Sequence, residues 1–274
     1  IFNGAVPYEV PHMLFAAYMV AGFLVASVYA VGMLRGRTNR YHRLGFAIPF
    51  AVAAIATPIQ LAIGDSAARA ISTDQVSKYA SMEYVGTTST HVPESIFGRW
   101  DGSGDVKGGI SIPDLNSILV GFSPDTEVKG LDTVPVNERP PSPTLLHWCF
   151  DIMVGIGTGL FFLALWFAWG MWRRRRPPEN RLFLGAASLA GVGAITALEC
   201  GWIVTEVGRQ PWIVFGLMTT ANGVSPSVSM GEVITSMTVF TLLYGALAVV
   251  EIKLFLHYVR KGAEPFEQPQ DPAD

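Results

Sequence analysis

The sequence is poor in charge. Of its 274 residues only 15% are Asp, Glu, Lys or Arg, whereas 50% are hydrophobic. A soluble domain averages about 25% charged residues. The net charge, from 19 Lys and Arg against 22 Asp and Glu, is -3. A membrane protein is therefore expected, and no nucleic-acid partner, because such a partner needs a basic surface that this sequence lacks.

Cysteine is scarce as well. Cys149 and Cys200 are the two cysteines, and each lies within an apolar run. This pattern excludes a disulfide framework and a thiolate metal cluster. The first apolar run is too long for a secretory signal and has no basic leader before it. Because the chain opens at Ile1 rather than Met, we expect a fragment of a longer protein.

Long apolar runs, by contrast, are present. A helix needs roughly 20 apolar residues to cross a bilayer, because hydrocarbon offers no partners to exposed backbone groups. We expect an all-α fold, a polytopic bundle of five transmembrane helices at residues 11–34, 45–63, 145–172, 182–205 and 230–257. The predicted organisation is helices within 1–63, a large polar loop or small cap at 64–144, helices within 145–260 and a tail at 261–274.

Positive charges in the short connections predict the orientation, since Lys and Arg stay on the cytoplasmic side. The connection between the fourth and fifth runs, residues 206–229, has Arg209 as its one basic residue. The other short flanks are rich in arginine. These flanks hold Arg35, Arg37, Arg40, Arg43, Arg173, Arg174, Arg175, Arg176, Arg181, Arg260 and Lys261. The N-terminus and the 64–144 loop are therefore predicted to lie outside, and the C-terminus in the cytoplasm.

Ionisable residues inside the apolar runs are costly and so suggest function. His12 and Met153 occupy compatible depths near the outer side, with Met153 ~12 Å along its helix. An imidazole and a thioether are the axial ligands of a low-spin haem. His147 is a rival ligand, but it faces away from Met153. In the alternative interpretation, His12 is a helix-end residue and Met153 is ordinary packing.

Two acidic residues share one face of the fourth run. Glu199 and Glu206 are seven residues apart, so they form an acidic stripe. The stripe is compatible with haem-iron binding, proton transfer, cation binding or a structural pair with another helix. Ser229 and Glu232, three residues apart, predict a capping box at the start of the last helix.

Several motifs resemble subunit I of cytochrome bd quinol oxidase. Residues 199–202 (Glu-Cys-Gly-Trp) and 207–212 (Val-Gly-Arg-Gln-Pro-Trp) resemble its signature. His12, and Met153 within Phe-Asp-Ile-Met-Val-Gly, resemble its low-spin haem ligands. Gly64-Asp65, Gln75, Lys78 and Glu83 resemble the start of its quinol loop. The five helices correspond to the last five of the family's nine.

The resemblance implies a respiratory terminal oxidase of the bacterial plasma membrane, which oxidises ubiquinol or menaquinol at the outer face and reduces dioxygen to water. It implies a low-spin haem b, a high-spin haem b and a haem d. By analogy, the site residues are His12 and Met153 on the low-spin iron, Glu199 on the high-spin iron, Arg209 and Trp212 near the haems, and Lys78 and Glu83 at the quinol. The implied partners are a second subunit, membrane lipid and a missing N-terminal half.

Alternatives remain beside this resemblance. Asp151 stands where well-known members carry Arg, which puts the pairing of the haem propionates in question. Lys78 and Glu83 taken alone are an ordinary solvated loop pair, while Arg209 and Trp212 alone are interfacial anchors. A proton- or cation-coupled transporter without haem, or a non-catalytic assembly subunit, is the competing function.

Overall fold

The computed structural model describes residues 4–101 and 106–261. The chain divides into two units, residues 1–222 and 223–274, which are described separately. Within the described residues, five helices are long and apolar enough to span a membrane. They are α1 (Val6–Leu34), α2 (Arg40–Asp74), α5 (Pro143–Arg174), α6 (Arg181–Gly208) and α7 (Met230–Lys261). The predicted all-α bundle with five transmembrane helices is confirmed.

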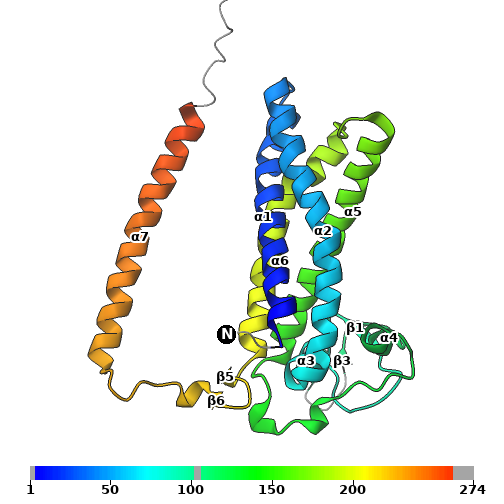
Figure 1. Cartoon of the computed structure of the whole chain (residues 1–274), viewed down its shortest axis with the longest axis vertical. Helices are drawn as coiled ribbons and strands as arrows, with labels where there is room; N and C mark the ends of the chain where they lie inside the picture. The colour runs from blue at the N-terminus through cyan, green and yellow to red at the C-terminus, as the bar shows by residue number, and fades with distance from the viewer. Residues whose placement is uncertain (1–3, 102–105, 262–274) are drawn as a thin grey trace, which may run out of the picture. The chain divides into compact units, whose positions relative to one another are not determined.

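Four of these helices form the bundle of the first unit (Figure 1). α1 packs against α2 and α6, and α5 packs against α6 and α2. Alanines and phenylalanines fill the interior, where the rings of Phe50 and Phe167 lie 4.6 Å apart and Phe23 meets Phe50 edge to face. Small residues let the helices approach closely while the aromatic rings fill the remaining space.

Helix α2 extends further than predicted. It runs to Asp74 rather than to residue 63, so Gly64 and Asp65 belong to the helix and not to the loop. Asp65 forms an ion pair with Arg69 one turn later, a spacing that stabilises a helix beyond its apolar part. The prediction was wrong here because hydropathy marks only the part of a helix that lies in lipid.

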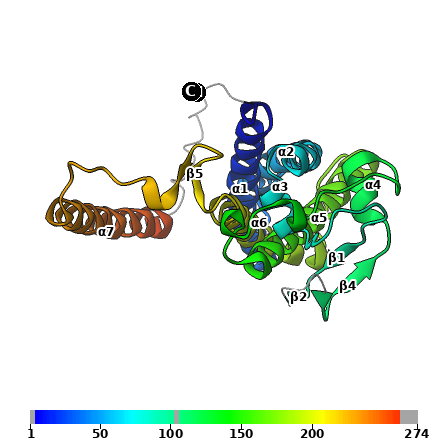
Figure 2. The same ribbon diagram turned by 90° about the horizontal axis from the view of Figure 1, so that it is seen from below.

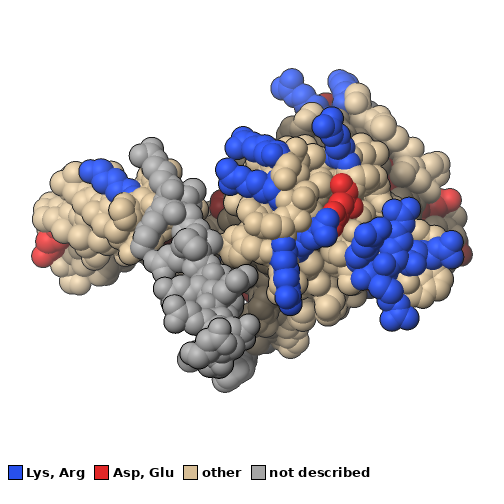
Figure 3. Space-filling model, turned by 90° about the horizontal axis from the view of Figure 1, so that it is seen from above, with Lys and Arg blue, Asp and Glu red and all other residues tan. Residues whose placement is uncertain are grey.

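The two arginine-rich connections of the first unit lie at one end of the bundle. Arg43 at the start of α2 binds Glu179 before α6 through two contacts of 3.0 Å. Figure 3 shows Lys and Arg side chains gathered on this end. The two connections thus lie on one side of the bundle, as the predicted orientation requires.

The segment between α2 and α5 folds into a small cap at the opposite end (Figures 1 and 2). It contains α3 (Val76–Met82), β1 (Glu94–Ile96), β2 (Arg99–Trp100), β3 (Val106–Lys107), β4 (Ile110–Ile112), α4 (Leu115–Gly121) and the 3-10 turns η1 (Leu131–Thr133) and η2 (Val136–Glu138). β1 pairs with β4 and β2 with β3, both antiparallel.

The cap shares a hydrophobic core with the bundle. Tyr79 and Met82 of α3 pack in one cluster with Leu146 of α5 and with Cys200 and Val204 of α6. The two free cysteines, Cys149 and Cys200, are both buried in this cluster. The ends of α5 and α6 nearest the cap therefore form part of the floor beneath it.

After α6 comes a hairpin of β5 (Trp212–Val214) and β6 (Met218–Thr219), followed by η3 (Thr220–Asn222). In the second unit, α7 begins with the predicted capping box, which is confirmed. The Ser229 backbone N donates to Glu232 Oε2 at 2.8 Å, and the Glu232 backbone N donates to Ser229 Oγ at 3.3 Å. The predicted tail lies outside the described residues except for Lys261.

Candidate functional site

His12 lies on α1 opposite the C-terminal half of α2. Its Nε2 is 3.2 Å from Nε2 of Gln60, and its Nδ1 is buried with no hydrogen-bond partner in the described part of the chain. A Cβ atom at position 64 would lie 3.2 Å from His12 Cε1, so Gly64 makes room for the ring. An imidazole nitrogen buried without a partner fits the chemistry of a metal ligand.

Met153 lies half-buried on α5 beside α6. A Cβ atom at position 201 would lie 3.0 Å from its sulfur, so Gly201 leaves room for the thioether. At Gly155, Gly157 and Gly159 on the same helix, no heavy atom of the described chain lies within 4 Å of the Cβ position. Gly157, about one turn after Met153, therefore leaves open space on the same helix face as the thioether, which fits a flat macrocycle beside a soft sulfur atom.

His147 has both ring nitrogens engaged. The side chain is fully buried, with Nδ1 2.7 Å from the Met82 carbonyl oxygen and Nε2 3.2 Å from Asp151 Oδ2. The Tyr84 ring stacks on it at 3.9 Å. Both ring nitrogens of His147 are therefore used in joining the cap to α5. This geometry is compatible with the expectation that His147 and Met153 do not bind the same iron.

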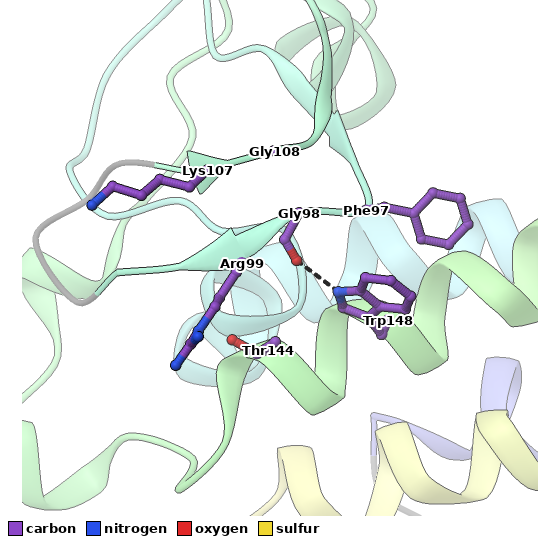
Figure 4. Close-up of a pocket in the computed structure, with 7 residues that line it drawn as sticks. All are labelled: Phe97, Gly98, Arg99, Lys107, Gly108, Thr144 and Trp148. Atoms are coloured by element: carbon purple, nitrogen blue, oxygen red, sulfur yellow. Dashed lines mark hydrogen bonds between the residues drawn. The ribbon is translucent and has the colours of Figure 1, made fainter.

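Asp151 fastens the cap to the bundle. Its carboxylate accepts a hydrogen bond from the Phe97 backbone N at 2.5 Å and pairs with His147. Next to it, Trp148 Nε1 donates to the Gly98 carbonyl oxygen at 2.6 Å (Figure 4). The acid that replaces the family's Arg is thus a paired group that binds the turn after β1.

An open pocket of about 480 Å³ lies between this turn and α5, and Figure 4 shows the residues that line it. Phe97, Gly98, Arg99, Lys107, Gly108, Thr144 and Trp148 line it. No predicted site residue is among them.

Lys78 and Glu83 are both buried, with exposed fractions of 4% and 5%. The Lys78 stem packs on α6, where a Cβ at position 208 would lie 2.9 Å from its Cγ. Burial lowers the pKa of Lys78, while the charges of Glu9 and Glu206 oppose that shift. The solvated loop pair, one alternative from the sequence, is therefore wrong.

Glu83 contacts a second carboxyl group that the sequence analysis missed. Its side chain is hydrogen-bonded to Glu94 of β1. Asn116 Nδ2 donates to Glu94 Oε2 at 2.8 Å, and the Tyr79 hydroxyl donates to Asn116 Oδ1 at 3.2 Å. Burial first and the Glu94 charge second raise the pKa of Glu83 well above its usual range. Burial also raises the pKa of Glu94.

Glu94 and Asn116 have no sequence signal because they lie in a polar segment without regular spacing. Glu94 lies on β1 and Asn116 in helix α4, and the fold brings these two side chains within 2.8 Å of each other. Gln60 carried a weak sequence signal, because it is an amide inside an apolar run. Polar residues at membrane depth often mark functional positions.

The remaining predicted residues lie at the outer end of α6 and just after it. Glu199 is exposed in the first unit, whereas Glu206 pairs with Arg209 at 2.5 Å. Trp212 begins β5 and meets Phe215 edge to face at 6.1 Å. The acidic stripe is thus divided, since one of its two carboxylates already has a cationic partner.

Spanning helices, a folded polar cap and titratable side chains buried where the two meet define a polytopic membrane protein with a site at the membrane edge. The family model for cytochrome bd terminal oxidase subunit I matches residues 1–263, and the chain belongs to this family. The family resemblance predicted from the motifs is therefore confirmed.

Individual relatives agree. The putative cytochrome bd menaquinol oxidase subunit I of Bacillus subtilis (strain 168) is 31% identical over 95% of this chain and 59% of the relative. The cytochrome bd ubiquinol oxidase subunit 1 of the same strain is 30% identical over 96% and 58%. The bd oxidase structure from Geobacillus thermodenitrificans has a TM-score of 0.82 and 33% identity, over 96% of this chain and 60% of that one. The chain thus spans about three fifths of the length of these relatives.

Proposed function

We propose that this chain is part of a respiratory terminal oxidase of the bacterial plasma membrane, which oxidises ubiquinol or menaquinol at the outer face and reduces dioxygen to water. Family membership over residues 1–263 supports the reaction class. The shared end of the two arginine-rich connections supports an orientation with the cap and N-terminus outside and the C-terminus in the cytoplasm. A second subunit and membrane lipid complete the assembly.

His12 and Met153 would hold the low-spin haem b. The unpartnered His12 nitrogen and the space around Met153 support this assignment. Glu199 would bind the high-spin haem b beside haem d, with Arg209 and Trp212 close to the haems. When bound, such haems supply one-electron transfer, and the doubly ligated one has no open position for oxygen.

Lys78 and Glu83 would form the quinol site. The observation that carries this proposal is their burial beneath the cap, since a buried Lys and a buried Glu in a polar segment need a function or a partner. A carboxyl group takes up the proton released when a hydroxyl is oxidised. The Lys78 amine donates hydrogen bonds to an acceptor such as a quinol oxygen.

The test uses the assembled, purified complex that contains this subunit. Quinol-dependent oxygen consumption is measured together with haem content by the pyridine haemochrome method. We expect Glu83→Gln to lower turnover about a hundredfold with the haem retained, since general acid–base groups contribute at least that much. Glu127→Gln, an exposed glutamate of the same cap, is the matched control and should keep full turnover.

A complex without haem would contradict the proposal and favour the transporter or the assembly subunit. The transporter has less support, because Glu206, half of the acidic stripe it would use, is already paired with Arg209.

A further inference from the structure

Glu83 and Glu94 place two carboxyl groups in contact within one buried site. The two side chains are hydrogen-bonded to each other and have exposed fractions of 5% and 9%. Two ionised carboxylates are acceptors only, so a hydrogen bond between them requires that one be protonated. Two like charges in contact within a buried site also repel each other, which opposes ionisation of both carboxyl groups.

The surroundings place the negative charge on Glu94 and the proton on Glu83. Asn116 Nδ2 donates to Glu94 Oε2 at 2.8 Å, and the Tyr79 hydroxyl holds the amide by donating to its oxygen at 3.2 Å. Glu83 Oε2, by contrast, is buried with no partner among the described residues. One end of the pair is therefore stabilised as an anion, and the other has an open acceptor atom.

Three further titratable groups face the pair. Tyr79 comes from α3, while His147 and Asp151 come from α5. The ring of His147 favours the Glu94 anion, and Asp151 opposes it. The charge of Asp151 also raises the pKa of Glu83.

We propose that Glu94 is the terminal acceptor of a two-carboxyl proton relay that begins at Glu83 Oε2. The inference rests on the proposed quinol oxidation. The quinol O–H bond breaks and its proton forms a new O–H bond with Glu83 Oε2. The proton that Glu83 already shares passes to Glu94, and the electron leaves for the low-spin haem. The pair thereby changes from one net negative charge to neutral. Glu94 acts through Glu83 and is a positioning residue for it.

The arrangement explains why two carboxyl groups are buried together. A single carboxylate waiting for a proton in this core would be strongly destabilised by lost hydration. In the pair, the negative charge lies on Glu94 rather than on Glu83, and the Asn116 amide stabilises it by a hydrogen bond. Glu83 therefore stays neutral while the pair as a whole remains able to accept a proton.

The experiment compares Glu94→Gln, Glu94→Asp and the exposed control Glu127→Gln in the assembled complex. Gln keeps the shape of Glu94 and an oxygen that can accept from Asn116 Nδ2, but its amide cannot take up the relayed proton. We expect Glu94→Gln to lower kcat at least about tenfold, to change KM less than about twofold and to alter the pH profile of turnover. Asp should restore part of the rate, and haem content should stay constant.

A second measurement is independent of assembly of the variants. The infrared pH-difference spectrum of the unaltered complex should contain a carboxyl C=O band that titrates above the usual carboxyl range, and Glu83→Gln should remove it. Turnover of Glu94→Gln within about twofold of the unaltered complex, with an unchanged pH profile, overturns the relay. Absence of the titrating band overturns it as well. Failure of the unaltered complex to oxidise quinol would instead defeat the proposed function.

Discussion

The bundle and the cap bury polar groups in different ways. In the bundle, buried hydroxyls bond to their own helix, as Ser27 Oγ does to the Leu24 carbonyl at 2.7 Å and Thr57 Oγ1 does to that of Ala53 at 2.7 Å. In the cap, Glu83 and Glu94 are buried against groups from other segments.

The difference indicates where in this fold polar and charged side chains from separate segments can meet. Within the bundle, a hydroxyl can be satisfied by a carbonyl of its own helix, which replaces the water that lipid does not supply. At the edge of the membrane, separate segments converge, so charges from several elements share one site. The five predictions below test this division, from the largest expected effect to the smallest.

The largest effect is expected at Met153, the proposed thioether ligand of the low-spin haem. Met153→Leu keeps the volume and removes the sulfur, so the low-spin haem signal should be lost completely from the reduced-minus-oxidised spectrum of the complex. Met171→Leu, on the same helix and exposed, is the control and should leave the spectrum intact. A full low-spin signal in Met153→Leu would defeat the ligand assignment.

The next test concerns apolar packing in the bundle. Phe50 is fully buried among Phe23, Phe167 and Phe183, so Phe50→Ala should lower the free energy of unfolding by about 3–5 kcal/mol. Ile55→Ala, on the same helix and 67% exposed, should cost far less. Detergent-induced unfolding measures both, and equal losses would mean that the core does not stabilise the bundle.

A smaller and more local effect is expected where cap and bundle meet. Asp151→Ala leaves the Phe97 N–H without its acceptor and removes the carboxylate partner of His147, which should cost about 1–3 kcal/mol. Limited proteolysis should cut the cap faster while the bundle stays resistant. Asp125→Ala, which removes an exposed contact of 3.2 Å to His91, serves as comparison. Uniform loosening of bundle and cap would contradict a local fastening role.

The stability of the cap should also depend on pH. The pKa of Glu83 is raised in the folded cap, by burial first and Glu94 second. The folded state therefore binds more protons than the unfolded state between the two pKa values, and stability falls as the pH rises through this window. Proteolysis of the cap should accelerate at higher pH, and Glu83→Gln should flatten the dependence. An opposite slope would mean that Glu83 is ionised in the fold.

The smallest effect is expected at the arginine-rich end of the bundle. Arg43 and Glu179 form a two-contact pair, but their side chains are 52% and 30% exposed. Water and salt screen such a pair, so a double-mutant cycle should give less than about 1 kcal/mol of coupling. A larger coupling energy would mean that this surface pair contributes substantially to the stability of the bundle.

The fold was largely predictable from sequence, whereas the site was predictable only in part. Apolar runs of membrane length predicted the five helices, since each helix satisfies its own backbone. The end of α2 was misplaced because residues 64–74 are helical without being apolar. His12, Met153, Lys78 and Glu83 were found through motif order, but neither the burial of Lys78 nor the contact of Glu83 with Glu94 follows from motif order.

The sequence by itself determined which segments cross the membrane, which connections are basic and which family the chain resembles, because these properties depend on local composition and order. The tertiary structure alone decided that Asp151 binds the Phe97 backbone, and that Glu94 meets both Glu83 and Asn116. These contacts join residues far apart in the chain, so packing of the cap onto α5 and α6 creates them and no local pattern encodes them.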